Sequence, residues 1–280
     1  MFRKIIRIIR TAFLVKKNRQ LIMLTLFFEI ILSNMTLNHG RELIERIGFY
    51  PECNAFSLIW NDTFFMMLFF FIVIFAFSNA PFRERVSSYV MIRSGKRLYV
   101  FAHVIYISIL SFLIPVFLYI VNAFFLPYRQ GNGEWGQFWG AISQNSEVYA
   151  DLNYISLDYR VLWDFTPKET LQHTMCICFL LCFMTGLLLY LTALHGRKKM
   201  GIIFIVSLVT MSRISVFYRM FRLYWVNPFT WICLNILTPE NNGILVNVFY
   251  AKAILCIIDV ILIMGILITS YKKRSYDERA

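Results

Sequence analysis

The sequence predicts an all-α membrane protein with six transmembrane helices, and three observations support this fold class. The chain of 280 residues is 59% hydrophobic with a mean hydropathy of +0.61, whereas soluble domains are about 45–50% apolar. Six apolar runs each supply the ~20 residues that a helix needs to cross a bilayer. The connections between the runs alternate in charge. We therefore expect a single transmembrane domain over residues 1–280.

The six apolar runs are 20–38, 56–80, 98–127, 170–194, 200–218 and 247–271. Asn61-Asp62 interrupts the second run, and Pro115 favours a kink or a tilt in the long third run. Arginines crowd the far end of the fifth, beginning with Arg213. The apolar piece Phe229–Leu237 is too short to span, and we interpret it as a re-entrant element before the last helix, shielded by protein or water.

Lysine and arginine in the short connections predict the orientation. Residues 1–19 carry seven of the 28 basic side chains, 81–97 carry five, 195–200 carry three and the segment after 271 carries four. Both termini are therefore expected in the cytoplasm of a bacterium, with the chain in its cell membrane. The large loop 128–169 is then extracellular, and its many aromatic residues favour folding back on the outer membrane surface.

The formal net charge of +12 does not indicate a nucleic-acid partner. The basic residues cluster beside apolar runs instead of forming one patch, which is typical of topology signals.

Residues 1–17 predict an interfacial helix. At about 100° per residue, apolar and basic residues separate onto opposite sides. The apolar side holds Phe2, Ile5, Ile6, Ile9 and Phe13, and the basic side holds Arg3, Lys4, Arg7 and Arg10. This pattern is typical of a helix lying on anionic lipid, so membrane lipid is an expected partner.

A second short helix is predicted over residues 82–93, on the membrane face between the second and third runs. Glu84 lies in its first turn, where the helix dipole favours a negative charge. Val86, Tyr89 and Val90 recur at helical spacing and share one face in this interpretation. Gly95 is a suitable stop. The alternative is a solvated connecting loop.

The six cysteines suggest packing more than chemistry. Four lie in apolar runs, where cysteine behaves as a small hydrophobe, and Cys176-x-Cys178 with Cys182 has no accompanying histidine pair for zinc. Cys53 and Cys233 can form a disulfide if both face outside, and the sequence leaves this open.

No sequence motif for bond chemistry is present, so we predict no catalytic residue, no metal site and no enzyme activity in this chain. Gly95-Lys96 lacks the rest of a P-loop. There is no His-Glu-x-x-His motif and no Gly-x-Ser-x-Gly elbow. Glu42-x-x-Glu45-Arg46 has no matching histidine on a helix face and does not support a membrane protease.

Glu29 and Asp259 stand inside the first and sixth apolar runs. A charge at a helix centre costs about 2.5–3.5 kcal/mol on insertion scales, so such residues normally face the bundle interior and find a partner. Arg213 and Asn122 are candidate partners. The functional interpretation is that Glu29, Arg213 and Asp259 line a substrate pathway, or that Arg213 forms a gating ion pair with one of the two acids. The alternative is a structural hydrogen bond or a protonated acid.

The order of these elements resembles the type 2 permease family of ABC transporters, the export-type transmembrane subunits. The resemblance covers nearly the whole chain through loose motifs. They are Phe2–Phe13, then Phe82-Arg83-Glu84-Arg85, Ser88-Tyr89-Val90 and Arg93-Ser94-Gly95-Lys96-Arg97, and finally Asn227-Pro228-Phe229-Thr230-Trp231.

The resemblance implies a permease that moves a hydrophobic or amphipathic substrate, such as a peptide, out of the cell. A separate ABC ATPase subunit would bind ATP and Mg, and a second permease, identical or similar, would complete the pathway. The coupling helix 82–93 would contact the ATPase through Glu84, Arg85, Val86, Tyr89, Val90 and Arg93. One alternative is a non-transporting immunity or sensor protein that binds a peptide at its outer loops. Another is a secondary transporter, which predicts inverted repeats or several intramembrane charges.

Overall fold

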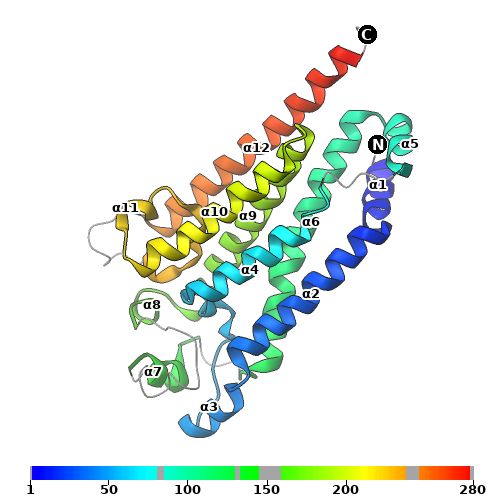
Figure 1. The fold of residues 1–280 in the computed structure, drawn as a ribbon. Helices are drawn as coiled ribbons and strands as arrows, with labels where there is room; N and C mark the ends of the chain where they lie inside the picture. The colour runs from blue at the N-terminus through cyan, green and yellow to red at the C-terminus, as the bar shows by residue number, and fades with distance from the viewer. Residues whose placement is uncertain (1, 81–84, 130–132, 145–158, 238–245, 278–280) are drawn as a thin grey trace.

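The computed structural model describes residues 2–80, 85–129, 133–144, 159–237 and 246–277, and every element in these ranges is helical (Figure 1). The α-helices are α1 (Phe2–Leu14), α2 (Lys16–Leu37), α3 (Gly40–Ile47), α4 (Thr63–Ala76), α5 (Arg85–Ser94), α6 (Lys96–Phe125), α7 (Gly136–Gln144), α8 (Tyr159–Asp164), α9 (Pro167–Leu194), α10 (Lys198–Phe217), α11 (Phe221–Tyr224) and α12 (Val248–Asp277). The 3₁₀ helices are η1 (Ala55–Ser57), η2 (Ile59–Asn61), η3 (Pro228–Ile232) and η4 (Leu234–Ile236).

Five segments of the described chain are long and apolar enough to cross a membrane. They are Lys16–Ile47, which joins α2 and α3, then α6, α9, α10 and residues Val248–Ser270 of α12. Each overlaps one of the predicted runs. The all-α class is therefore confirmed, and the long apolar helices are compatible with a membrane protein.

The second predicted run, 56–80, is broken instead of forming one straight helix. Residues Ala55–Asn61 meet α4 at an angle of 104°. Asp62 causes the break because its carboxylate accepts a hydrogen bond from the backbone N–H of Phe64, 2.8 Å away, and so caps the start of α4. The Asn54 side chain caps η1 in the same way through the N–H of Phe56.

Helix α9 lies at the centre of the bundle. It packs against α6, α10 and α12, while α4 packs between α2 and α10. Helices α6 and α9 approach each other closely at Gly186, where an added Cβ would lie 2.5 Å from the side chain of Ile107. A glycine at this position therefore lets the two helices touch.

The long third run forms one continuous helix. Helix α6 passes through Pro115 without interruption over its 30 residues, which is about 45 Å at 1.5 Å per residue. It exceeds the ~30 Å of the hydrocarbon core, so it tilts or extends beyond it in a bilayer.

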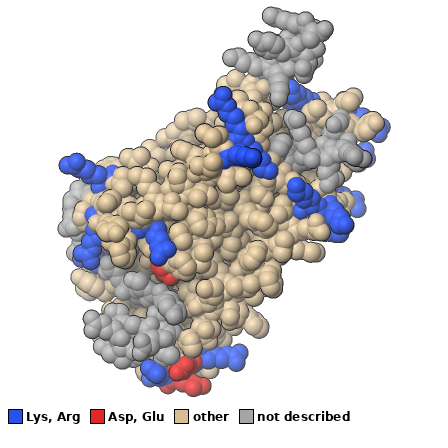
Figure 2. All heavy atoms as spheres, viewed as in Figure 1, with Lys and Arg blue, Asp and Glu red and all other residues tan. Residues whose placement is uncertain are grey.

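The bundle has two ends, which are separated by an apolar outer surface. Figure 1 places the N-terminus, α5 and the end of α12 together, and we call this the α5 end. Helices α3, α7 and α8 lie at the opposite end, which we call the α3 end. On the face drawn in Figure 2, basic side chains gather toward the ends, and a broad uncharged band lies between them. Exposed apolar residues of α2, α10 and α12 line the outside of the bundle, among them Phe27, Phe204 and Ile261.

The large loop predicted over 128–169 is partly helical. Helix α7 packs against α3 and α8, and its residues Phe138 and Trp139 are buried. The indole of Trp135 donates to the carbonyl of Phe165, 2.7 Å away. These described parts fold back on the bundle, whereas residues 130–132 and 145–158 lie outside the described ranges.

The predicted amphipathic helix at the N-terminus is present as α1, but its buried face differs in detail. Arg3, Lys4, Arg7 and Arg10 are exposed. Ile5 and Ile8 are buried, and α1 packs along α6. Ile6, which the helical projection placed on the apolar side, is exposed. Helix α1 therefore buries one edge of its apolar side against protein and leaves the other edge free.

Candidate functional site

Helix α5 is held on the α5 end of the bundle by a small apolar cluster. Val90 and Met91 of α5 pack against a core formed by Ile5, Ile8, Tyr99 and Ala102 of α1 and α6. Gly95 separates α5 from α6 with a φ of 83°, a conformation that glycine adopts without strain. The helix therefore ends where the sequence predicted, and one residue joins it to the start of α6.

The opposite side of α5 presents large side chains to the surroundings. Tyr89 is 73% exposed and Ile92 is 78% exposed, and Arg93 beside them is exposed as well. An exposed aromatic and an exposed aliphatic residue one turn apart, next to an arginine, form a surface suited to a protein partner. Sequence reasoning missed Ile92, although it follows Tyr89 at i+3 spacing.

Three of the predicted coupling residues cannot be placed as side chains. Glu84 lies outside the described residues, and the side chains of Arg85 and Val86 are not described. The prediction that Val86, Tyr89 and Val90 share one face is corrected for the two that are described. Val90 packs against the cluster of α1 and α6 whereas Tyr89 is exposed, because consecutive helical residues lie about 100° apart.

Helix α2 turns its polar residues inward. Its buried residues include Asn18, Thr25, Glu29, Ser33 and Thr36. Its large apolar residues face outward, among them Phe27, Ile30 and Ile31. The spacing of 18, 25, 29, 33 and 36 is helical, so this polar stripe could have been found in the sequence.

Glu29 is the charged member of this stripe, and its side chain is fully buried at 0% exposure. Neither carboxylate oxygen has a hydrogen-bond partner among the described residues, and the hydroxyl of Ser33 one turn away also lacks one. Cys178 on the central helix α9 lies within electrostatic range of Glu29. The expectation that Glu29 faces protein is confirmed, whereas the expected polar partner is not found.

Arg213 does not pair with Glu29 within the chain. Its guanidinium carbon lies 4.8 Å from the centre of the Phe64 ring on α4, and Asp62 lies within its electrostatic range. No ion pair to Glu29 occurs among the described residues. The correction has a simple physical reason: Arg213 lies near the far end of α10, beside the start of α4. Asn122 is also buried with its amide unpartnered.

Asp259 is the second buried acid, at 3% exposure on α12. Both of its carboxylate oxygens lack a hydrogen-bond partner among the described residues. Cys256 one turn before it is an electrostatic neighbour of Asp259, and Cys176 of α9 is in turn a neighbour of Cys256. Two turns before Asp259, the Lys252 ammonium lies 3.1 Å from Nδ1 of His173. Polar groups thus follow one another along the α9–α12 contact.

The 3₁₀ helices form two buried pairs, η1 with η2 and η3 with η4, and the two pairs contact each other. The Cys233 thiol donates to the carbonyl of Trp60, 2.9 Å away, and the rings of Phe70 and Phe229 pack edge to face at 4.8 Å. Phe229, Trp231 and the other residues of η3 are shielded by protein, which is the condition for non-helical backbone at membrane depth. Cys53 and Cys233 are both free thiols, so the disulfide that the sequence left open is not formed.

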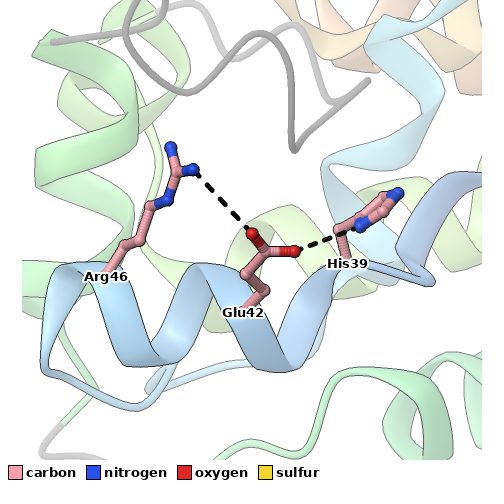
Figure 3. A network of polar contacts seen from close by, with 3 residues as sticks. All are labelled: His39, Glu42 and Arg46. Carbon is pink, nitrogen blue, oxygen red and sulfur yellow. Dashed lines mark hydrogen bonds and ion pairs between the residues drawn. The ribbon is translucent and has the colours of Figure 1, made fainter.

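The polar network of α3 is exposed (Figure 3). Glu42 Oε2 lies 3.4 Å from Nδ1 of His39, and Glu42 Oε1 lies 3.8 Å from the guanidinium of Arg46. Glu42 and Arg46 belong to α3 and His39 directly precedes it, and all three side chains are about half exposed. Such surface pairs contribute little and enclose no site. Among the described residues, no group of three His, Cys, Asp or Glu side chains could hold a metal ion.

Comparisons of the chain with protein-family models, with curated proteins and with solved structures find no match.

Proposed function

We propose that this chain is the permease subunit of an ATP-driven exporter. It moves a hydrophobic or amphipathic substrate, such as a peptide, and works with a separate ATPase subunit that binds ATP and Mg. The observation that carries this proposal is the exposed surface of α5. Tyr89 and Ile92 are too large and too exposed to be explained by packing within the chain, and they are suited to a partner protein.

The proposed topology has six crossings. It counts η1, η2 and α4 as one broken crossing beside the five long apolar segments. In this topology both termini and α5 lie in the cytoplasm of a bacterium, which the basic residues of 1–19 and 81–97 support. Segments η3 and η4 then form the re-entrant element before the last helix.

Motion can pass from α5 to the bundle by two routes. Gly95 joins α5 directly to α6, which runs the length of the bundle. Val90 and Met91 pack against the cluster that α1 and α6 form together, and α1 is followed by α2 after Val15. A partner that pushes on Tyr89 and Ile92 when it closes on ATP would therefore move α6 and the N-terminal helices together. Two permease subunits, identical or similar, would then change the side to which their shared interface opens.

Glu29 is the residue through which this chain would contact the pathway. Its buried carboxylate stands on a polar stripe, which supports a role in the interior of the bundle. Because Glu29 is fully buried within its own chain, a pairing with Arg213 of a second permease would require α2 to move away from the bundle first.

Copurification tests the proposed partner directly. The full chain, expressed and tagged in its native cells, should retain a Walker-motif ATPase after detergent extraction. Tyr89→Asp and Ile92→Asp should each lower the retained ATPase, and the substrate export, at least tenfold. Tyr89→Phe keeps the ring and serves as the matched control. Normal ATPase retention and export in both aspartate variants would refute this assignment of α5.

A second candidate function is favoured by one observation at the α3 end. Trp163 of α8 is 85% exposed and Tyr159 one turn before it is also exposed. These rings are suited to a peptide bound outside, as in a non-transporting immunity or sensor protein. This function predicts peptide binding that Trp163→Ala abolishes and that needs no ATPase. Export that depends on α5 but not on Trp163 would reject it.

A further inference from the structure

We infer that this chain binds an anionic phospholipid at one defined site, with an acyl chain in a cavity between α1, α2, α4 and α6. The inference uses the proposed topology and does not depend on transport. It rests on a cavity, on the chemistry of the cavity wall and on the charges beside it.

The cavity has a volume of about 170 Å³. Six of its lining residues are Phe13 of α1, Ile22 and Leu26 of α2, Ala76 of α4, and Leu113 and Ile114 of α6. An engineered apolar cavity of about 150 Å³ in another protein stays free of water and binds benzene. A cavity of this size therefore accepts a segment of hydrocarbon.

The wall of the cavity is apolar and does not suit a polar ligand. Among the nine residues that line it, Thr25 is the polar one. The Thr25 hydroxyl donates to the carbonyl of Leu21 in its own helix, 2.8 Å away. A peptide, a sugar or a hydrated ion would leave its polar groups unpaired there, which costs about 1–3 kcal/mol for each group.

The cavity opens toward the outside of the bundle. Leu113 lines it and is exposed, and its neighbour Phe112 on α6 is exposed as well. Both belong to the apolar surface that would contact lipid tails in a membrane. An acyl chain can therefore enter sideways from the bilayer.

Basic side chains stand beside the α5 end of the cavity. Arg19 shares a face of α2 with the lining residues Ile22 and Leu26, at i+3 and i+7 spacing. Arg10 precedes Phe13 at the same i+3 spacing on α1. Both arginines are exposed, and the first acidic residue of the chain is Glu29. This charge suits a phosphate-bearing headgroup with a net negative charge in the cytoplasmic leaflet.

Native mass spectrometry of the purified full chain tests the site. Phosphatidylglycerol and phosphatidylcholine with identical acyl chains are added in equal amounts, and the first bound lipid is counted. We expect phosphatidylglycerol to bind about tenfold more tightly. Arg10→Gln with Arg19→Gln should remove this preference, since each charge near the surface is worth about fivefold. Lys199→Gln removes an exposed charge from α10 at the same end and should leave the preference unchanged.

A second pair of variants tests the cavity. Leu113→Trp and Ala76→Leu fill it from two different helices and should each lower the binding of both lipids about tenfold. Phe112→Trp enlarges the exposed neighbour outside the cavity and should change neither. Equal losses in Phe112→Trp and Leu113→Trp would overturn the inference, because they would indicate unspecific lipid contact. Equal binding of the two lipids to the unaltered chain, or unaltered binding in both cavity variants, would overturn it as well.

Discussion

The Cys233 thiol and the Trp60 carbonyl form a 2.9 Å hydrogen bond between two segments that lie 173 residues apart. The bond joins the 3₁₀ pair before α4 to the 3₁₀ pair before α12. Both partners are fully buried, so neither can turn to water if the other is removed. The contact therefore fixes how the two irregular parts of the bundle fit together.

Replacing Cys233 should separate the hydrogen bond from the packing. Cys233→Val keeps the volume but leaves the Trp60 carbonyl unpaired, and it should lower the free energy of unfolding by about 1–3 kcal/mol. Cys233→Ser keeps a donor and should lose less. Thermal unfolding in detergent measures both variants. A serine variant that is less stable than the valine variant would contradict the assigned bond.

Cys53 should react slowly with thiol reagents in the folded protein. Burial, with a smaller contribution from the Glu52 charge, raises the pKa of its thiol from 9.0 to about 12. Since each pKa unit is tenfold, the reactive thiolate at pH 8 is about 10³-fold scarcer than for a thiol with a pKa of 9. Peptide mapping after N-ethylmaleimide treatment, with and without denaturant, measures the difference.

The same pKa has a consequence for stability at high pH. Because the folded pKa lies above the unfolded one, the native state favours the neutral thiol. Its contribution is complete below about pH 9 and is lost as the pH rises toward 12. Labelling of Cys53 should therefore accelerate above pH 9 more steeply than that of a free thiol peptide. Parallel pH profiles for the two would contradict this.

Gly186→Ala should destabilise the contact between α6 and α9. The added methyl would lie 2.5 Å from Ile107 and 3.2 Å from the ring of Phe77. Overpacking of this kind typically costs about 1–3 kcal/mol. Gly140→Ala is the matched control, since nothing lies within 4 Å of a Cβ at that helical glycine. Equal melting temperatures for the two variants would contradict the prediction, because they would show that the contact between α6 and α9 accommodates the added methyl group.

Substitutions of Glu29 should distinguish a pathway residue from a structural one. Glu29→Gln keeps the size and removes the charge, and Glu29→Leu removes both polar oxygens. If Glu29 acts in transport, the glutamine variant should alter export or its pH dependence while the melting temperature changes little. If the carboxyl serves only the fold, glutamine should be nearly silent in export and in stability. Export assays and melts of both variants, with Ser33→Ala as a neighbour control, decide between the two.

Hydropathy was enough to predict the long helices, because each needs only a sustained apolar run. The burial of Glu29 and Asp259 was also predictable from the cost of charge in hydrocarbon. The pairing of Glu29 with Arg213 was not, since it depends on how helices far apart in sequence pack. Asp62 indicated an interruption in the second run. The 104° angle at that point could not be predicted, because it depends on the cap that Asp62 forms and on the burial of Trp60 in the core.

The broken second run also bears on the order in which the protein is assembled. Helix α4 has 14 residues and covers about 21 Å, which is less than the hydrocarbon thickness. Segments η1 and η2 fill the rest of that depth. Lipid cannot form hydrogen bonds with the backbone N–H and C=O groups at their ends, so these groups must be covered by protein. Helix η1 packs against α6 and α9, and η2 packs against α4 and η4, so three of these four elements are synthesised after α4. In the proposed topology, the second run therefore reaches its final position only after residue 236 has been synthesised.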